Sequence, residues 1–303
     1  MVILFLLITS GTSFYLFREH RALFARLEET KKTHQRNALK NSRDLEMARR
    51  IQSGLLTANK IQYRNYQLSA VCFPAEKIGG DFFILQKQLS NHLETAEAPP
   101  HGVIVLKNTK EEALHFLIGD VSGHGVASAL VMILAKNILE DLFAEKISPR
   151  RVMHLANKKL IEYTEGSAIN FVTAFGATLD PLSGKLIFSK AGHTAPLLFR
   201  KNGEVLPLET EGVFLGMFVN PEFEEKEIFL EKGDKLFLYT DGVSEARNAK
   251  DELLGTQKLI DILRQNIWLS GDALFQKILD DIKEYTGGTA NSDDITMVLL
   301  EVS

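Results

Sequence analysis

The chain has 303 residues, of which 45% are hydrophobic and 24% are charged, and its formal net charge is -4. This composition is that of a globular protein and excludes a wholly disordered chain, a collagen-like repeat and a multi-span membrane protein. The single cysteine, Cys72, excludes an internal disulfide and a zinc site built from several thiolates. The negative charge argues against a general nucleic-acid-binding protein.

The charges are unevenly divided along the chain. Residues 1–58 contain ten Lys and Arg residues and five Asp and Glu residues, so their net charge is +5. Residues 59–303 contain the remaining 25 basic and 34 acidic residues and therefore carry -9. We expect these two parts of the chain to face different partners.

The first 17 residues, MVILFLLITSGTSFYLF, have no charged side chain. As a helix they would span about 25 Å, which is at the short limit for crossing a bilayer. Basic residues begin at Arg18, and the positive-inside rule then places the rest of the chain in the cytoplasm. We predict a single transmembrane anchor at 1–17, with the body at the cytoplasmic membrane. The alternatives are the truncated end of a longer membrane protein and a signal peptide, which would carry positive charge before the apolar run.

Residues 18–58 are predicted to form a linker helix. The segment has no proline and a single glycine, Gly54, and it is rich in Arg, Lys, Glu, Ala and Leu, which favour helices. Some apolar residues are spaced by seven, but the heptad pattern is broken around His34 and Asn37. The pattern is equally consistent with a solvated spacer and with a dimeric linker that transmits a signal.

From residue 59 onwards, short apolar runs bounded by Gly, Pro, Asn or Asp predict β-strands. These strands are expected at 67–74, 114–120, 170–180, 185–192, 195–203, 226–234, 235–242 and 295–302. Short turns such as Asp180–Gly184 join several of them, so we expect the sheets to be antiparallel.

Two pairs of helices are predicted between the strands. The apolar periodicity places them at 126–145, 149–163, 256–266 and 271–285. Runs of strands with segregated helices indicate an α+β domain over 59–303, with helices covering the sheets. The stretch from Gln86 to Glu112 contains a Pro-Pro pair and many polar residues, and we expect a long surface excursion there.

Four aspartates share one sequence context, at or beside the end of an apolar strand. They are Asp81 in IGGDF, Asp120 in IGDVSG, Asp241 in YTDG, and Asp293, which with Asp294 precedes ITMVLLEV. A turn or strand cap is the simpler explanation of any single one. Four that converged would repel one another unless a cation neutralised them. Oxygen ligands suit Mg²⁺ or Mn²⁺, and two such ions can clamp a phosphate ester and activate a water.

Other chemistries fit the sequence less well. The eight histidines form no HExxH motif or Cys/His pair, and His124 and His193 lie in Gly-rich turns where a turn-stabilising role is expected. Ser122 lacks a G-x-S-x-G nucleophile elbow. The segment Gly123–Ser128 imitates a dinucleotide-binding turn, but hairpins follow it and not the βαβ units of a nucleotide-binding enzyme.

Eight motifs follow one another along the chain in a characteristic order. They are IQSGLL (51–56), FPAEKIGGDFF (73–83), IGDVSGHGVASAL (118–130), FVTAFGATLDPLSGKL (171–186), KAGHTAPLL (190–198), GVFLG (212–216), EKGDKLFLYTDGVSEARN (231–248) and SDDITMVLLEV (292–302). In this order they resemble bacterial phosphatases of the stage II sporulation E type, a branch of the PPM superfamily of metal-dependent serine/threonine phosphatases. The resemblance covers about residues 45–302.

This resemblance implies a PPM-type α-β-β-α sandwich of two antiparallel sheets flanked by helices, with two Mn²⁺ or Mg²⁺ ions between them. Its catalytic pair would be Asp120, which bridges the ions, and Asp81. The implied metal ligands are Asp81, Asp120, the Val121 carbonyl, Asp241 and Asp293, with Asp294 beside them in a possible supporting role. A metal-bound hydroxide would hydrolyse phosphoserine or phosphothreonine on a small anti-anti-sigma-type protein, without a phosphoenzyme.

The resemblance also implies that the linker helix is a regulatory switch and forms a homodimer. The sequence departs from the family pattern in three places: Thr57 replaces a common proline, Ile84 stands where an Asp often follows GGDFF, and the excursion at 86–112 is longer than usual. An alternative function is a non-catalytic signalling scaffold on the same fold that binds a sigma-regulator protein. The complete set of aspartates favours the enzyme.

Overall fold

The computed structural model describes residues 2–56, 59–95, 106–164, 171–289 and 293–303, which is all of the chain except short segments. Within these ranges the side chains of residues 2–25, 89–95 and 106–111 are not described. Contacts within the chain divide it into two compact units, Met1–Ile51 and Gln52–Ser303. The boundary predicted between linker and domain, after residue 58, stays a prediction.

Helix α1 (Val2–Leu55) runs through the first unit, so the long helix predicted for the linker is confirmed. Its described side chains there are mostly exposed, including the apolar Leu27, Leu39, Met47 and Ile51. Their spacing forms no continuous stripe, in line with the broken heptad pattern. Among the helices whose side chains are described, none is both long and apolar enough to cross a membrane. The anchor expected at the chain start falls on side chains outside that set.

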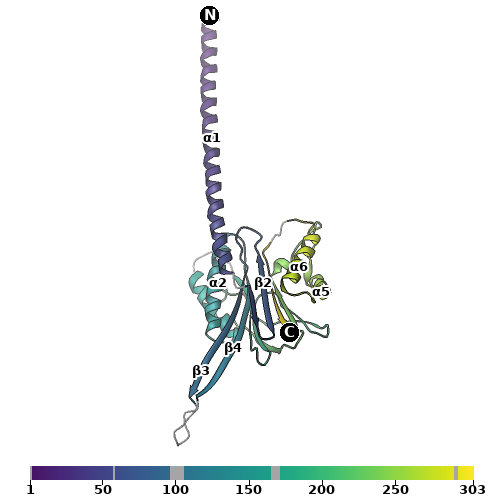
Figure 1. Cartoon of the computed structure of the whole chain (residues 1–303). Coiled ribbons are helices and arrows are strands. Elements are labelled where there is room, and N and C mark those ends of the chain that lie inside the picture. The colour runs from purple at the N-terminus through teal and green to yellow at the C-terminus, as the bar shows by residue number, and fades with distance from the viewer. Residues whose placement is uncertain (1, 57–58, 96–105, 165–170, 290–292) are drawn as a thin grey trace, which may run out of the picture. The chain divides into compact units, whose positions relative to one another are not determined.

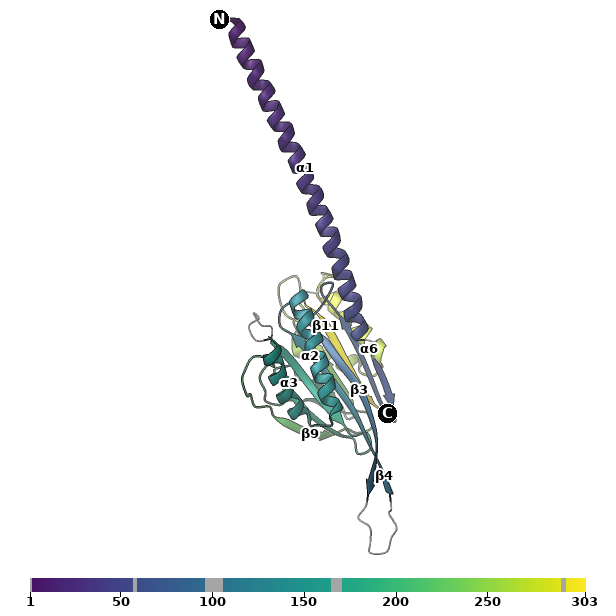
Figure 2. The ribbon, with the colours of Figure 1, turned by 90° about the vertical axis from the view of Figure 1, so that its left-hand side faces the viewer.

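The second unit is built on two antiparallel sheets (Figure 1, Figure 2). The first has the order β1-β2-β11-β10-β7-β8, and its strands are β1 (Lys60–Tyr63), β2 (Tyr66–Phe73), β7 (Leu197–Phe199), β8 (Val205–Pro207), β10 (Lys235–Tyr239) and β11 (Ile295–Val302). The second has the order β3-β4-β5-β6-β9, and its strands are β3 (Phe82–Thr95), β4 (Leu106–Val121), β5 (Val172–Leu179), β6 (Lys185–Ala191) and β9 (Glu225–Phe229).

Helices cover the outer face of each sheet. Helices α2 (Val126–Ala144) and α3 (Pro149–Thr164) pack on the second sheet, as Figure 2 shows, and α5 (Gly255–Asn266) and α6 (Gly271–Tyr285) pack on the first. One cluster of buried apolar side chains lies between the two sheets, and two others lie between a sheet and its helices. The predicted α+β sandwich with α-β-β-α layers is therefore confirmed.

Strand β10 illustrates how the sequence builds these layers. Leu236 and Leu238 point into the cluster between the sheets, whereas Phe237 and Tyr239 point into the cluster beneath α5 and α6. Successive side chains of a strand face opposite sides, and both sides of this strand are covered. Each large apolar side chain buried in this way stabilises the fold by roughly 1.5–3 kcal/mol.

The helix boundaries agree with the predictions within about one residue, but the strands contain errors. The sequence predicts no strand at β1, β3 or β8, and it predicts a long strand at 195–203 where only the three residues of β7 are found. The segment at 86–112, predicted as a long surface excursion, has strand structure at both of its ends that the sequence did not predict. These ends belong to β3 and β4, which pair continuously from Phe82↔Gly119 to Thr95↔Leu106. The sequence did not indicate this hairpin because many of its residues are polar. The backbone hydrogen bonds between two paired strands do not require apolar side chains.

Candidate functional site

Two of the predicted site residues lie on neighbouring strands of the second sheet. Asp81 directly precedes β3, and Asp120 is the last residue but one of β4. Because Phe82 pairs with Gly119, the antiparallel register brings Asp81 opposite Asp120. The next residue, Val121, is fully buried in the layer beneath α2 and α3, which fixes the end of the strand that carries Asp120.

Two further predicted residues lie at neighbouring strand ends of the first sheet. Asp241 begins the short helix α4 (Asp241–Ser244) just after β10, and Asp293 lies two residues before β11. The backbone N–H of Thr240 donates to the carbonyl of Thr296 over 3.1 Å, which continues the β10–β11 pairing to this edge. The four residues Asp81, Asp120, Asp241 and Asp293 are called the aspartate cluster below.

The aspartate cluster carries uncompensated negative charge. Burial raises the pKa of Asp81 well above its ordinary range, and the charges of Asp120 and Asp294 raise it further. Burial and the charges of Asp241 and Asp293 raise the pKa of Asp120 to about 7. The pKa values of Asp241 and Asp293 are also raised, first by burial. No Lys or Arg in the described part of the chain forms an ion pair with any of the four.

The donor set fits a hard divalent cation. Within the described residues, no three His, Cys, Asp or Glu side chains lie close enough together to hold a metal ion, so the fit is one of donor type and not of a formed site. A Cβ on Gly80 would lie 2.7 Å from the carbonyl oxygen of Val121, so glycine leaves that oxygen uncovered. Carboxylate and carbonyl oxygens are the ligands that Mg²⁺ and Mn²⁺ prefer. The metal-binding role of each residue stays a prediction.

Thr240 is a residue of the site that the sequence analysis missed. Its side-chain hydroxyl donates a hydrogen bond to Oδ2 of Asp81 over 2.8 Å and accepts one from the N–H of Thr296 over 3.0 Å. Thr240 is fully buried and links the first sheet to a carboxylate of the second. The available signal was its place in YTDG, directly between an apolar strand and Asp241.

Asp294 holds the loop that leads into Asp81. Its Oδ1 accepts the N–H of Ala75 over 2.7 Å, and its Oδ2 accepts the N–H of Gly80 over 2.7 Å and that of Asp81 over 3.4 Å. A Cβ on Gly79 would lie 2.1 Å from Oδ2 of Asp294, so the loop can come this close to the carboxylate only with glycine at position 79. The geometry thus gives Asp294 a positioning role toward Asp81.

The two histidines of the Gly-rich turns differ in their surroundings. His124 is exposed and pairs with Glu76 over 3.3 Å. His193 is buried, its Nδ1 lies 2.8 Å from Oγ1 of Thr173, and burial lowers its pKa to about 3, so the ring is neutral. Thr173 is the strand partner of Asp120, so His193 contacts the strand next to the one that carries this carboxylate.

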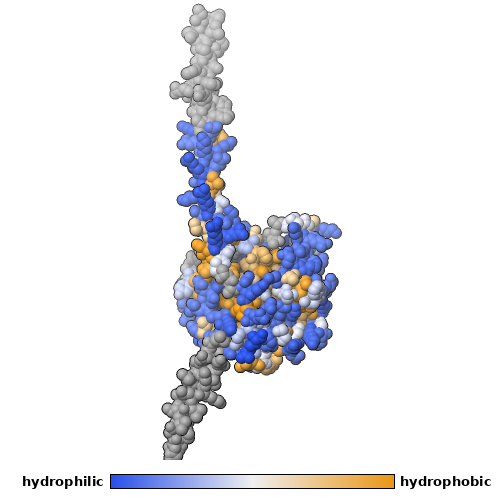
Figure 3. Space-filling model, viewed as in Figure 1, coloured by the Kyte–Doolittle hydropathy of each residue, from blue (hydrophilic) through white to orange (hydrophobic). Residues whose placement is uncertain are grey.

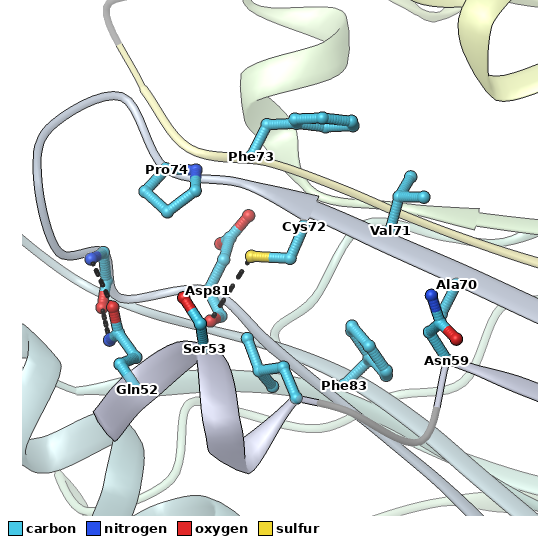
Figure 4. Close-up of a pocket in the computed structure, with 12 residues that line it drawn as sticks. Gln52, Ser53, Asn59, Ala70, Val71, Cys72, Phe73, Pro74, Asp81 and Phe83 are labelled. Atoms are coloured by element: carbon cyan, nitrogen blue, oxygen red, sulfur yellow. Dashed lines mark hydrogen bonds between the residues drawn. The ribbon is translucent and has the colours of Figure 1, made fainter. Parts of the chain in front are cut away.

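The end of helix α1 that belongs to the second unit contacts the same loop. Gln52 is buried, its Nε2 donates to the carbonyl of Gly79 over 2.7 Å, and its Oε1 accepts the N–H of Gly79 over 3.1 Å (Figure 4). Since Gly79 is two residues before Asp81, the motif IQSGLL is tied to the site by its glutamine. The resemblance rests in part on this motif, but the sequence alone indicates no role for Gln52.

A pocket of about 250 Å³ lies beside Gln52, between the last turn of α1 and strand β2 (Figure 4). Hydrophobic residues reach the surface beside β2 within a largely hydrophilic face (Figure 3). The Sγ of Cys72 in this pocket lies 3.9 Å from the carbonyl oxygen of Asp81, and burial raises the pKa of the thiol. A neutral thiol that faces a backbone oxygen is a poor metal ligand, so the donor set remains one of oxygens.

Known proteins resemble this chain in sequence. It matches the family model of stage II sporulation protein E (SpoIIE) over residues 110–303. It is 26% identical over 287 residues to the protein IcfG of Synechocystis sp., and 24% identical over 258 residues to the phosphoserine phosphatase RsbU of Bacillus subtilis. Each match covers 85% of this chain, which spans 41% of the length of IcfG and 69% of that of RsbU.

Solved structures resemble it in fold. The SiaA-PP2C domain of Pseudomonas aeruginosa superimposes with a TM-score of 0.64 at 19% identity, covering 88% of this chain and 98% of that one. RsbX in complex with magnesium superimposes with a TM-score of 0.55 at 17% identity, covering 80% and 98%. The family match spans more than half of the chain and includes Asp120, Asp241 and Asp293. The chain therefore belongs to the SpoIIE family, and its fold is that of the PP2C-type serine/threonine phosphatases.

Proposed function

We propose that this protein is a metal-dependent phosphatase that hydrolyses phosphoserine or phosphothreonine on a regulatory protein. The aspartate cluster carries the proposal, because its carboxylates stand at the ends of neighbouring strands in the two sheets, with raised pKa values and no Lys or Arg partner in the described chain. Such repulsion destabilises the fold until positive charge is added from outside. Membership of the SpoIIE family and the likeness to the phosphoserine phosphatase RsbU support the same function.

The carboxylates of the aspartate cluster and the carbonyl of Val121 would hold two Mg²⁺ or Mn²⁺ ions. When bound, such ions offset the negative charge of a phosphate group and lower the pKa of water. The chain's own residues position the ligands: Thr240 fixes one oxygen of Asp81, and Asp294 fixes the backbone on which Asp81 stands. Fixed carboxylates lose little entropy when they bind a cation, so this rigidity favours binding.

Neither the thiol nor the buried histidine near the cluster is suited to act as the nucleophile, so we assign that role to water. The thiol of Cys72 is neutral and contacts a backbone oxygen, and the ring of His193 is buried, neutral and hydrogen-bonded to the hydroxyl of Thr173. A phosphate dianion would be repelled by the carboxylates alone, which makes cation binding a condition for substrate binding. The protein should therefore hydrolyse the phosphate ester directly, with no phosphorylated residue.

The substrate that this proposal favours is a small phosphorylated protein of the anti-anti-sigma type. The support is the likeness to RsbU, a phosphoserine phosphatase, and to structures that join RsbU-type and RsbW-type domains in one chain. The negative charge of the body, -9 over residues 59–303, argues against a general preference for nucleic acid.

The test is Mn²⁺-dependent release of phosphate from a phosphoserine protein by the full chain. Activity should vanish with a chelator and return with Mn²⁺ or Mg²⁺, and Asp120→Asn should lose it. Asp180→Asn, which removes a carboxylate from an exposed turn, is the matched control and should retain activity. Activity that persists in Asp120→Asn or in the chelator contradicts the mechanism. A folded protein with no activity and no metal binding would favour the scaffold function instead.

We further propose that residues 1–17 anchor the protein in the cytoplasmic membrane by a single span and that the linker helix forms a homodimer. The support is the uncharged start of the sequence, the basic residues that follow it and the length of α1. Full-length protein should enter the membrane fraction and require detergent, and a variant lacking residues 1–17 should not. Recovery of the full chain in the soluble fraction would contradict the anchor.

A further inference from the structure

A groove in the second unit runs between α3 and the segment at 219–223. It consists of two adjoining hollows of about 540 and 390 Å³, which share Arg151, His154 and Asn220. Helix α3, visible in Figure 2, forms one wall, and residues 219–223 form the other. The groove is separate from the aspartate cluster, and the proposed reaction leaves it without a role.

The second wall of the groove is held in place by a buried residue of α3. The Nδ2 of Asn157 donates to the carbonyl of Phe218 over 2.9 Å, and its Oδ1 accepts the N–H of Gly216 over 2.9 Å. Asn157 is 2% exposed, and Phe223 at the far end of the wall is packed in the core beneath α3. A buried amide with both ends satisfied fixes a loop firmly, so the groove exists before any partner binds.

The groove carries unpaired positive charge. Arg150, Arg151 and Lys158 line it, and none of them forms an ion pair with a carboxylate of the described chain. Two acidic residues, Glu162 and Glu222, also line it, which leaves a positive excess on a body whose net charge is -9. An acidic partner would be repelled by most of this domain and attracted here.

Two of these cations occupy an unfavourable position on α3. Arg150 and Arg151 lie in its first turn, where the helix dipole favours acidic residues, and that turn contains none. The N–H of Arg150 is instead satisfied by the carboxylate of Glu225 on β9, over 2.9 Å. The dipole therefore does not account for the arginines at this end of α3, and their guanidinium groups remain available to a partner.

Large apolar side chains stand exposed beside the charges. Met217 and Phe218 are about half exposed, and Val219, which lines the groove, is 78% exposed. Neighbouring exposed apolar residues of this size are typical of a surface that a protein partner covers. Together with the arginines they describe a partner with an acidic and apolar face.

The groove is connected to the aspartate cluster by backbone pairing. Leu215, just before the wall, exchanges two hydrogen bonds with Val172, and Val172 is the strand partner of Val121. Two strand spacings separate the backbones of Leu215 and Val121, or about 10 Å. The segment that leads into the wall of the groove and the strand that carries Asp120 are thus attached to the same sheet.

We propose that the groove between α3 and residues 219–223 docks the phosphorylated protein substrate, through an acidic and apolar surface next to its phosphorylated residue. This inference rests on the proposed phosphatase function. Arg151 and Lys158 attract the acidic groups, and Val219 packs against the apolar ones. Docking in the groove raises the local concentration of the phosphate ester at the cluster and selects one protein over others.

The test compares two substrates on the same enzyme. One is the phosphorylated anti-anti-sigma-type protein that the full chain dephosphorylates best, and the other is p-nitrophenyl phosphate, which is too small to reach the groove. In Arg151→Glu/Lys158→Glu, the ratio of kcat/KM for the phosphoprotein to that for p-nitrophenyl phosphate should fall at least tenfold, mainly through KM. The fall should shrink as NaCl is raised, because salt screens exposed charges. Arg151→Lys/Lys158→Arg should restore the ratio.

Two further variants test whether the loss depends on the position of the charges and on the apolar contact in the groove. Lys232→Glu/Lys250→Glu changes the net charge by the same amount at exposed lysines outside the groove, and its ratio should match that of the wild type. Val219→Ser should lower the ratio severalfold without a change in its salt dependence.

An unchanged ratio in the groove variants would overturn the proposal, as would an equal loss on both substrates. A changed oligomeric state, measured by light scattering, would show that a second copy of the chain covers the groove. Absence of wild-type activity on both substrates would instead refute the phosphatase function itself.

Discussion

Two buried aspartates lie near opposite ends of strand β10, Asp234 directly before it and Asp81 against Thr240, the residue that follows it, and their charges are compensated differently. Before the strand, Asp234 is 1% exposed, lies 2.5 Å from a guanidinium nitrogen of Arg200 and accepts the N–H of Glu231. Beyond the strand, Asp81 is 2% exposed and accepts the hydroxyl of Thr240, with no cation from the described chain. The two carboxylates are equally buried. Arg200 supplies positive charge to Asp234, whereas no cation of the described chain supplies it to Asp81.

This comparison separates a structural carboxylate from a functional one. The pair of Asp234 and Arg200 closes one end of the sandwich, where Lys235 and Glu301 also pair over 2.8 Å. At the other end the carboxylates repel one another, which costs stability in the isolated chain and creates affinity for a cation. We therefore expect substitutions at the first end to change stability and substitutions at the second end to change activity.

The largest expected effect is the loss of activity in Asp120→Asn. Removing this carboxylate should lower metal-dependent kcat/KM by roughly a thousandfold, since the cations supply several kcal/mol of transition-state stabilisation. The melting temperature of the metal-free protein should stay the same or rise, because one repulsive charge is gone. Thermal unfolding in a chelator measures this. A lowered melting temperature would show that the carboxylate is structural.

The opposite outcome is expected for Asp234→Asn. It leaves the guanidinium of Arg200 in a largely buried position without its partner, and we expect a loss of about 3 kcal/mol in the free energy of unfolding. Urea denaturation measures the loss, and activity per folded molecule should be unchanged. Asp272→Asn, which breaks the exposed pair with Lys60, is the control and should cost less than about 1 kcal/mol. Equal losses in the two variants would contradict the distinction.

Thr240→Val tests the support of the cluster and should have an intermediate effect. Without its hydroxyl, one oxygen of Asp81 loses a hydrogen bond and the N–H of Thr296 loses its acceptor. Metal affinity should fall roughly 10–100-fold, as measured by titration of Mn²⁺. Thr240→Ser keeps the hydroxyl and should bind metal nearly as well as the wild type. If both variants bind equally weakly, packing and not the hydrogen bond is responsible.

The last expected effect is a dependence on pH of the free energy of unfolding of the metal-free protein. In the folded chain the pKa of Asp120 is raised from its ordinary 3.8 to about 7, so the folded state binds this proton more tightly than the unfolded chain. The stabilisation is complete below pH 3.8 and is lost as the pH rises through about 7, by at most about 1.4 kcal/mol per pH unit for one proton. Adding Mn²⁺ should reverse the loss at high pH.

The experiment measures the free energy of unfolding of the wild type and of Asp120→Asn by urea denaturation from pH 5 to pH 8, and the quantity to follow is the difference between the two. The difference is needed because burial lowers the pKa of His115 to about 4 and that of His193 to about 3, which makes stability rise with pH. Both proteins share that contribution. A difference that does not change with pH would mean that Asp120 is not desolvated in the folded protein.

The sequence predicted the elements whose signal is local and apolar. All four long helices of the body follow the 3.6-residue period closely, and β11 was predicted at its observed bounds. The hairpin of β3 and β4 was missed, because its strands beyond the sheet are polar and are defined by their mutual hydrogen bonds. The four aspartates were found because each adjoins an apolar strand, but Thr240 and Gln52 were missed because their partners are 159 and 27 residues away.

By itself, the sequence determined which segments form the helices and most of the strands, and that four aspartates stand at strand ends. Its ordered motifs also determined the family. Periodicity and strand-end residues are properties of neighbouring positions, so they can be read along the chain. The tertiary structure decided which charges are left unpaired. Asp81 and Asp234 look alike as acids beside apolar strands, and only the strand pairing brings Arg200 to one and more carboxylates to the other. Electrostatic energy depends on distance in space, which the order of residues does not contain.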